Sequence, residues 1–286
     1  MQYKHKLSVC LCIRNEAKYI PEFIEHYIKQ GADHFYIINN KSDDNIEEVI
    51  ANSPYSRSIS LLYDDRELNV LTNPGYEGHK SLLDDNLYER VRLESEWIII
   101  VDADEFMYGR NGHTLKSYIH TIPDDVDCVY VLWNIVRPRK NDGQITSEFS
   151  IKSSGKRLNY DTFKNVSYYI QSANLFGKSV IRTKGINEYV KLWLHKAFVH
   201  GRVMNNYGET CTNKSDNGEI INYSEDNYRK VDIALNHYAI RNQQDLEKKI
   251  KQLDQKPEKY DFIRGLIEMC DLNDEYLVQD DEINLF

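Results

Sequence analysis

Residues 97–105, with the sequence WIIIVDADE, decide the fold. The first five are apolar, which is typical of a short central strand buried on both faces of a parallel sheet. Asp102 and Asp104 follow this strand directly. Two carboxylates at a strand end can both reach one divalent cation, which prefers oxygen ligands and keeps open positions for phosphate oxygens. The alternative is an acidic loop that caps the next helix, because D-x-D tripeptides are common in a chain with 45 acidic residues.

The chain before this stretch alternates between strand and helix patterns. Leu7–Ile13, His34–Ile38 and Ile59–Tyr63 are predicted strands. Apolar residues at helical spacing predict a helix that starts near Ile20 and ends at Gly31, and a longer one follows over about 77–94. This alternation favours an α/β fold built from βαβ units, with helices on both faces of a sheet.

Three polar clusters, at 14–16, 39–44 and 102–105, each follow a predicted strand directly. Ligands of open α/β sheets bind beyond the carboxyl ends of the strands. We therefore expect the three clusters to converge on one cleft.

The pattern is looser after residue 125, where the predicted elements are strands at 128–133, 179–182 and 192–199, a polar loop or irregular hairpin at 137–157, and an exposed loop at 205–227. Asn242 can cap a helix, and Pro257 separates it from a second one that carries Phe262 and Leu266.

Composition excludes several classes of protein. The 36 basic and 45 acidic residues give a net charge of −9, which argues against a nucleic-acid binder. No run reaches the roughly 18 apolar residues of a membrane span, and Leu7–Ile13 has no cleavage site after it, so we expect a cytoplasmic protein. The odd, scattered cysteines favour buried thiols in a reducing compartment over redox or metal chemistry; they are Cys10, Cys12, Cys128, Cys211 and Cys270.

Four segments are distinctive in their order along the chain, namely SVCLCIRNEA at 8–17, FYIINNKSDD at 35–44, WIIIVDADEF at 97–106, and LNHY at 235–238 with LEKK at 246–249. Together they resemble the motifs of family 2-like glycosyltransferases, in the subgroup related to family 92. The resemblance implies a GT-A (Rossmann-like) fold, with a mixed, mostly parallel sheet and C-terminal helices. It implies a nucleotide-sugar-binding half (1–125), an acceptor-binding half of the same domain (126–240) and a C-terminal helical extension (241–286).

The resemblance also implies a donor site with Mn²⁺ or Mg²⁺. Asp104 is the expected direct metal ligand, and Asp102 would contact the ribose, the metal or both. Asn39 stands where many relatives have an aspartate that contacts the base. An amide offers a hydrogen-bond donor as well as an acceptor, so the resemblance predicts uridine as the base less strongly. Arg14 and Glu16 would line the nucleotide pocket or pair with each other at the strand end. The expected donor-binding residues are Arg14, Asn15, Glu16, Asn39, Asn40, Asp43 and Asp102.

GT-A enzymes often complete the metal shell with a late histidine, for which His195, His200 and His237 are candidates. The subgroup tends to have a histidine shortly after an element resembling residues 196–199, but this chain has NNY at 205–207. The expected ligand is therefore His237, which lies inside a matched motif. A satisfied structural histidine is the alternative.

Transfer with inversion needs a general base near the acceptor hydroxyl. Glu148 and Asp142 are the candidates and Asp161 is a third, each also explained as a solvated loop residue. A cationic loop could contact a diphosphate or a lipid-linked acceptor, although a solvated surface is favoured; its members are Arg137, Arg139, Lys140, Lys152, Lys156 and Arg157. Four tyrosines of the acceptor half could stack on a sugar, namely Tyr168, Tyr169, Tyr189 and Tyr207.

These observations favour a metal-dependent glycosyltransferase that moves a sugar from a nucleotide-diphosphate donor, preferably a UDP-sugar, to a glycan or lipid-linked acceptor. By analogy it would invert the configuration and serve surface polysaccharide synthesis, in the cytoplasm or at the inner face of the membrane. Peripheral membrane contact and a homodimer are further expectations. The alternatives are a nucleotidyl- or phosphoryl-transfer enzyme with the same carboxylate pair, although no glycine-rich phosphate loop is present, and a non-catalytic carbohydrate-binding module.

Overall fold

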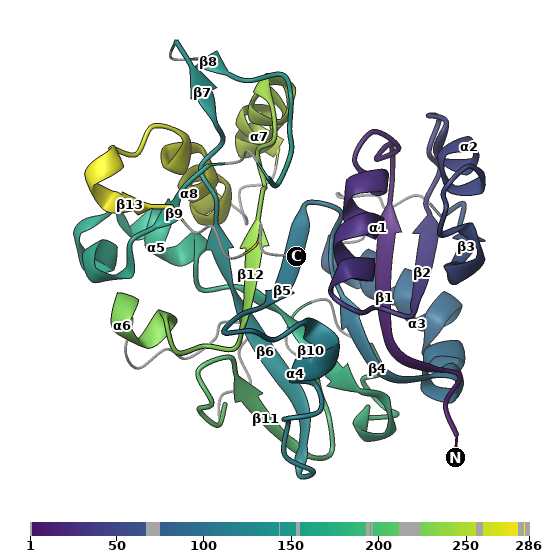
Figure 1. The fold of residues 1–286 in the computed structure, drawn as a ribbon. Coiled ribbons are helices and arrows are strands. Elements are labelled where there is room, and N and C mark those ends of the chain that lie inside the picture. Colours follow the sequence, from purple (N-terminus) through teal and green to yellow (C-terminus); the bar gives the residue numbers. More distant parts are fainter. Residues whose placement is uncertain are drawn as a thin grey trace.

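The computed structural model describes residues 2–66, 75–142, 144–152, 155–192, 195, 197–211, 224–255, 260–279 and 283. Its centre is a nine-stranded mixed sheet with the order β3-β2-β1-β4-β10-β6-β12-β5, in which β11 also pairs with β6 (Figure 1). The strands are β1 (His5–Ile13), β2 (His34–Asn39), β3 (Ile59–Tyr63), β4 (Ser95–Ile100), β5 (Glu105–Gly109), β6 (Val126–Ile135), β10 (Gly177–Arg182), β11 (Arg202–Asn205) and β12 (Ile233–His237).

Most strand pairs are parallel, as predicted. The pairs β1–β2, β2–β3, β1–β4, β6–β11 and β6–β12 are parallel, whereas β10 runs antiparallel to β4 and β6, and β5 antiparallel to β12. Two small antiparallel pairs lie outside this sheet, β7 (Lys140–Asn141) with β8 (Gln144–Ile145) and β9 (Arg157–Leu158) with β13 (Leu277–Val278).

Helices cover both faces of the sheet, because successive side chains of its buried strands point to opposite sides. Val9 and Leu11 of β1 pack with α1 (Ile20–Lys29), whereas Cys10 packs with α3 (Gly75–Glu94) on the other face. The remaining helices are α2 (Ile46–Ala51), α4 (Leu115–Tyr118), α5 (Tyr168–Ala173), α6 (Glu225–Tyr228), α7 (Gln243–Gln255) and α8 (Tyr260–Cys270). Short 3-10 turns span Ser56–Ser58, Tyr160–Asn165, Thr183–Gly185 and Asp274–Tyr276.

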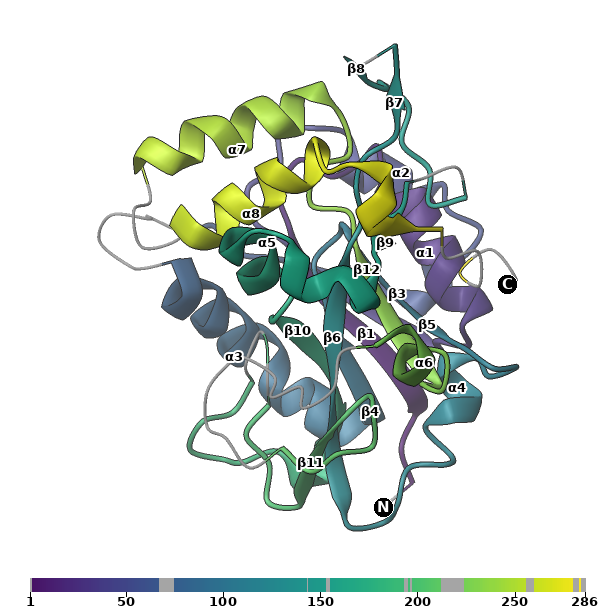
Figure 2. The ribbon, with the colours of Figure 1, turned by 90° about the vertical axis from the view of Figure 1, so that its left-hand side faces the viewer.

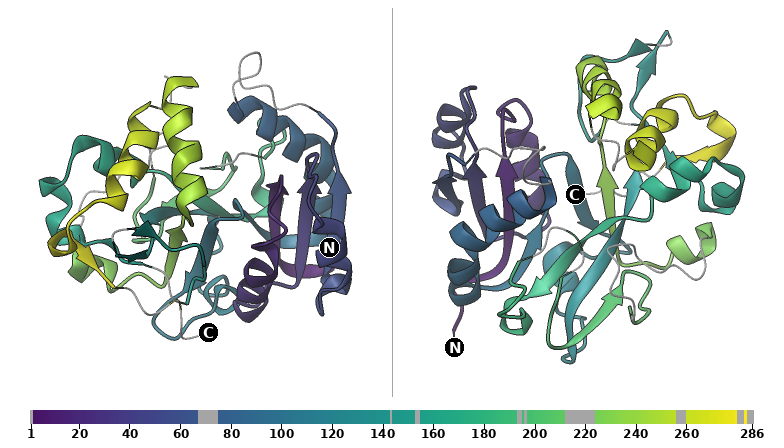
Figure 3. Two further views of the ribbon diagram at one scale, coloured as in Figure 1. Left: turned by 90° about the horizontal axis from the view of Figure 1, so that it is seen from above. Right: turned by 180° about the vertical axis from the view of Figure 1, so that it is seen from behind.

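The C-terminal helices pack on the second half of the molecule. Helices α5, α7 and α8 form one layer (Figure 2), on the opposite side of the molecule from α1 and α2 (Figure 3). A Cβ atom at Gly265 of α8 would lie 2.1 Å from the carbonyl oxygen of Tyr169, so only glycine permits this close approach to α5. As predicted, Asn242 caps α7 by accepting a hydrogen bond from the Asp245 amide, at 2.9 Å.

Two predictions in the looser half are wrong in part. Residues 192–199 form no strand where they are described; Val199 makes an isolated bridge with Ile186, and residues 193, 194 and 196 lie outside the described chain. The supposed exposed loop at 205–227 begins with the end of β11 and closes with α6, whose Glu225 is buried, while residues 212–223 lie outside the described chain. In both cases pairing with residues distant in sequence decides the structure. Pro257 also lies outside the described residues.

The five cysteines are thiols outside any disulfide; Cys10, Cys128 and Cys270 are buried, as predicted, whereas Cys12 and Cys211 are only partly buried. No helix in the described ranges is both long enough and apolar enough to cross a membrane. The division into donor half, acceptor half and extension stays a prediction.

Candidate active site

Residues 102–105 form an acidic turn. This turn follows β4 at the carboxyl edge of the sheet and leads directly into β5. Its two ends are joined, since the Asp102 amide donates to Glu105 Oε2 at 2.7 Å and the Glu105 amide donates to the Asp102 carbonyl at 3.1 Å. The Asp102 side chain is 56% exposed and that of Asp104 is 21% exposed, so both reach the surface of this edge.

Asp104 faces His237. Its Oδ2 atom lies 3.6 Å from His237 Nε2, which is too far for a hydrogen bond. His237 lies opposite Glu105 in the β12–β5 register, and its buried Nδ1 has no hydrogen-bond partner among the described residues. Burial would raise the pKa of Asp104, but His237 and Arg241 outweigh it and hold this pKa well below its usual range. Asp104 is therefore ionised and directed at a histidine nitrogen.

Lys178 of β10 is a site residue that the sequence analysis missed. Its side chain is 1% exposed, and its Nζ atom lies 2.8 Å from Asp102 Oδ2 and 3.4 Å from Glu105 Oε2. Burial would lower the pKa of Lys178, but the two carboxylates outweigh burial and raise it. Burial also raises the pKa of Glu105 well above its ordinary value. The only sequence signal was a lysine directly before the predicted strand at 179–182.

The turn after β1 is joined to Arg241, which precedes α7, and through Arg241 to α7 itself. Glu16 accepts two hydrogen bonds from the Arg241 guanidinium, at 2.7 and 3.3 Å, and Arg241 Nε also binds Asp245 at 3.1 Å. The guanidinium lies 3.9 Å from the centre of the Tyr19 ring. Burial raises the pKa of Glu16 although Arg241 opposes the rise. Glu16 thus links the predicted donor half to α7, by an ion pair 225 residues apart in sequence.

The turns after β1 and β2 converge, as the topology predicted. The Asp43 amide donates to Asn15 Oδ1 at 2.9 Å, and the Asn15 amide donates to Ser42 Oγ at 3.0 Å. Asn39 is buried and accepts from the Ser42 amide at 2.9 Å. The side chains of Arg14, Asn15 and Asp43 are exposed at this edge.

The buried Asn40 ties the turn after β2 to the residues after β3. Its Nδ2 donates to the carbonyls of Asp64 and Arg66, at 2.8 and 2.9 Å. Asp64, which the sequence analysis did not single out, accepts from Arg66 and from Asn86, and its pKa is lowered to about 2 chiefly by Arg66. Asn40 therefore orders this edge of the sheet.

The three candidate bases lie in different places. Asp142 is exposed in the turn between β7 and β8. Asp161 accepts a hydrogen bond from the Glu225 amide at 3.0 Å, at the start of α6. Glu148 lines a small pocket with Tyr238 and Arg241, and the Tyr238 amide donates to the Asp104 carbonyl at 2.8 Å. Of the three, Glu148 shares neighbours with the acidic turn.

The histidines considered as metal ligands also lie in different places. His200 is exposed and pairs with Glu188 at 2.8 Å. His195 Nδ1 donates to the Gly177 carbonyl at 3.0 Å, and the ring lies 5.6 Å from that of Trp133. The Trp133 ring is also 4.4 Å from the His237 ring. An aromatic side chain therefore connects His195 and His237.

Most of the cationic loop is paired within the protein. Arg137 and Lys156 bind Asp274 at 2.6 and 2.7 Å, and Lys140 binds Asp271 at 2.5 Å. These ion pairs agree with the surface interpretation rather than with a phosphate site. Arg139 and Lys152 are exposed.

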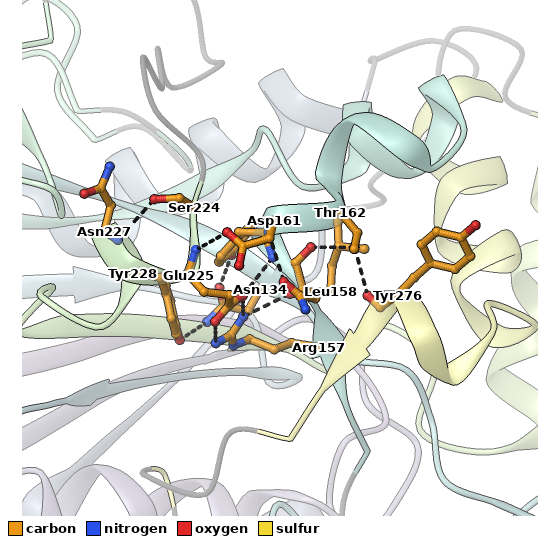
Figure 4. Close-up of polar contacts among 12 residues, drawn as sticks. Asn134, Arg157, Leu158, Asp161, Thr162, Ser224, Glu225, Asn227, Tyr228 and Tyr276 are labelled. Carbon is orange, nitrogen blue, oxygen red and sulfur yellow. Dashed lines mark hydrogen bonds and ion pairs between the residues drawn. The ribbon is translucent and has the colours of Figure 1, made fainter.

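Arg157 lies inside the protein instead, in the network of Figure 4. It forms two hydrogen bonds with the buried carboxylate of Glu225, at 2.7 and 2.8 Å, and its guanidinium lies 3.9 Å from the Tyr228 ring centre. Asn134 joins this network through Tyr228 and through Asn236, the neighbour of His237. The network connects α6 and β9 to β6, which carries Asn134, and to β12, which carries His237.

The four tyrosines do not gather at the acidic turn. Tyr168 and Tyr169 lie on α5, 5.8 Å apart between ring centres, and Tyr189 is 87% exposed. Tyr207 lines a cavity of about 380 Å³ with Tyr118 and Asn206, beside β11.

A mixed sheet with an acidic turn at the carboxyl end of a central strand is the architecture of GT-A glycosyltransferases. The chain belongs to glycosyltransferase family 92, whose model matches residues 5–260. A family 92 protein of Oryza sativa subsp. japonica is 30% identical over 115 residues, which are 40% of this chain and 18% of that protein. One of Arabidopsis thaliana is 28% identical over 148 residues, 49% of this chain and 23% of that protein. The matched segments thus span about a fifth of these relatives.

Solved structures with a weaker likeness include TarS 1–349 of S. aureus in complex with UDP, which is 18% identical with a TM-score of 0.38, covering 62% of this chain and 47% of that one. HddC from Yersinia pseudotuberculosis is 12% identical with a TM-score of 0.38, covering 70% of this chain and 89% of that one.

Proposed function

We propose that this chain is a metal-dependent glycosyltransferase. It moves a sugar from a nucleotide-diphosphate donor, with uridine as the favoured base, to a hydroxyl of a glycan or lipid-linked acceptor and inverts the configuration. Membership of family 92 supports the reaction class. The observation that carries the metal site is the pair formed by Asp104 Oδ2 and His237 Nε2, 3.6 Å apart at the carboxyl edge of the sheet.

The two atoms suit a divalent cation such as Mn²⁺ or Mg²⁺. Nitrogen and oxygen ligands lie about 2.1 Å from such ions, so two ligands of one ion are about 3 Å or more apart. No three His, Cys, Asp or Glu side chains of the described residues form a metal-binding group, which leaves positions open to phosphate oxygens and water. Asp104 and His237 would hold the ion, which supplies positive charge to the departing diphosphate. Asp102 also belongs to the acidic turn, and we assign it to the ribose hydroxyls.

The turns after β1 and β2 support the donor side of the proposal. Asn15 and Asn39 fix their shape through backbone amides, which leaves the exposed Arg14 and Asp43 at the edge where a nucleotide would bind. Glu16 contributes indirectly, since it holds Arg241 beside Asp104. A preorganised edge of this kind lowers the entropy cost of binding a flexible donor.

For the acceptor side we assign the general base to Glu148, which lines a pocket with Tyr238 and Arg241. A base must lie within hydrogen-bond reach of the hydroxyl that it deprotonates. Asp142 is the second candidate, at the tip of the β7–β8 hairpin. The test is a comparison of Glu148→Gln with Asp142→Asn, in which Glu148→Gln is expected to lose at least about a hundredfold in kcat.

The cellular setting follows from the resemblance alone. We place the reaction in the cytoplasm or at the inner face of the membrane, in the synthesis of a surface polysaccharide. A carbohydrate or lipid-linked glycan would be the acceptor, and a homodimer and peripheral contact with the membrane belong to the same proposal.

Incubation with a panel of nucleotide sugars and Mn²⁺, followed by measurement of free nucleotide diphosphate, tests the proposal. We expect slow release that stops with EDTA and is absent in Asp104→Asn, with the melting temperature unchanged. Release of pyrophosphate would support the nucleotidyl-transfer alternative. Binding of a sugar without any turnover would support the non-catalytic carbohydrate-binding module.

A further inference from the structure

The acidic turn contains its own cation. We propose that Lys178 is a built-in counter-ion of this turn, which occupies Asp102 and thereby weakens the binding of a divalent cation in the absence of the nucleotide. The inference rests on the proposed function. It adds that metal and nucleotide diphosphate bind together, because the turn alone offers the metal too little negative charge.

The position of Lys178 is fixed by the sheet. Strand β10 is hydrogen-bonded to β4 on one side and to β6 on the other, and Lys178 lies opposite Val131 in the β6 register. The side chain is 1% exposed. The pairing with β6 fixes the backbone of Lys178, and the buried side chain places its ammonium group at the acidic turn.

The ammonium group is shared between two carboxylates of the turn. It lies 2.8 Å from Asp102 Oδ2 and 3.4 Å from Glu105 Oε2. Glu105 is fully buried, and its Oε2 also accepts from the Asp102 amide at 2.7 Å. Lys178 and Glu105 thus hold both the side chain and the backbone of Asp102, so Lys178 acts as a positioning residue.

The consequence follows from the charges. Asp102 already has a cationic partner in Lys178, whereas Asp104 faces His237 and is the carboxylate that would attract a metal. A divalent cation that approached Asp102 would be repelled by the ammonium group of Lys178, which lies 2.8 Å from the Asp102 carboxylate. The negative charges of a nucleotide diphosphate offset this repulsion, which makes nucleotide and metal binding cooperative.

The test is calorimetric titration of Mn²⁺ into wild type, Lys178→Met, Lys178→Arg and Lys178→Met/Glu105→Gln, with and without UDP. The double variant removes the buried ammonium group together with the buried Glu105 carboxyl group, so it guards against misfolding of the single variant. The control is Lys116→Met, which breaks another lysine–aspartate pair, with Asp33, near the amino end of β2.

We expect wild type, Lys178→Arg and Lys116→Met to bind Mn²⁺ weakly alone and more tightly with UDP. Lys178→Met and the double variant are expected to bind Mn²⁺ alone about tenfold more tightly or better. If wild type binds Mn²⁺ with UDP but neither methionine variant binds Mn²⁺ more tightly, the counter-ion inference is wrong and the proposed function stands. If wild type binds no Mn²⁺ even with UDP, the metal-dependent function fails, and this inference with it.

Discussion

His237 Nε2 and Asp104 Oδ2 lie 3.6 Å apart, where β12 meets the start of β5. The strand pairing holds the histidine, because His237 is opposite Glu105, the next residue after Asp104. Asp104 is held by its own backbone, whose carbonyl accepts from the Tyr238 amide at 2.8 Å. The geometry that we assign to a metal is therefore fixed by backbone hydrogen bonds.

Replacement of His237 by glutamine should weaken Mn²⁺ binding in the presence of UDP by at least about tenfold, because one of two protein ligands is lost. Calorimetry measures the change. His200→Gln is the matched control, since His200 is exposed and pairs with Glu188. Equal affinities of the two variants would remove His237 from the metal site.

Arg241→Met should uncouple the turn after β1 from α7. The substitution leaves Glu16 without its guanidinium partner in a partly buried position, which costs about 2–4 kcal/mol of unfolding free energy. The KM for the donor should rise as the turn loosens. Urea unfolding and donor kinetics measure these effects, and Lys29→Met, which breaks the exposed pair with Glu25, should leave the unfolding free energy essentially unchanged. A stable Arg241→Met protein with an unchanged KM would show that the link does not order the donor site.

Because the Arg157–Glu225 pair is buried, the stability of the fold should depend strongly on both residues. Arg157→Met leaves a carboxylate buried without its cation and should destabilise the fold by about 3–5 kcal/mol. Arg157→Met/Glu225→Gln should recover a large part of this loss, because no charge remains buried and unpaired. Urea denaturation measures the unfolding free energy of the two variants. Equal losses of unfolding free energy in the single and double variants would contradict this prediction.

The stability conferred by Asp64 should depend on pH. Its pKa in the folded protein is about 2, below the ordinary value of 3.8. A group with a lowered folded-state pKa stabilises fully above its unfolded pKa, and the contribution disappears as the pH falls through the folded one. The expected contribution is about 1 kcal/mol after screening around the half-exposed Arg66. The stability difference between wild type and Asp64→Asn should therefore shrink progressively between about pH 5 and pH 1, and a difference that stays constant over this range would contradict the assignment.

Local sequence patterns predicted the elements whose burial is continuous or periodic. The apolar runs at 7–13 and 97–101 became β1 and β4, and the helical spacing after Ile20 became α1. Strands β5 and β12 were missed, because they are short and form by antiparallel pairing of segments over 120 residues apart.

The residues of the candidate site also fall into those that the sequence could predict and those that it could not. Asp102, Asp104 and His237 stand in motifs, so they could be singled out from the sequence. Lys178 could not, because a lysine beside a predicted strand is normally exposed, and its burial depends on the insertion of β10 between β4 and β6. The link between Glu16 and Arg241 likewise joins residues 225 positions apart.

The central claim is that Asp104 holds a divalent cation through which the nucleotide diphosphate binds. Calorimetric titration of UDP into wild type and Asp104→Asn, each with Mn²⁺ and with EDTA, tests it most directly. We predict that wild type binds UDP with Mn²⁺, and that binding is lost with EDTA and in Asp104→Asn at an unchanged melting temperature. Equal UDP affinity in EDTA, or in Asp104→Asn with Mn²⁺, would contradict the claim.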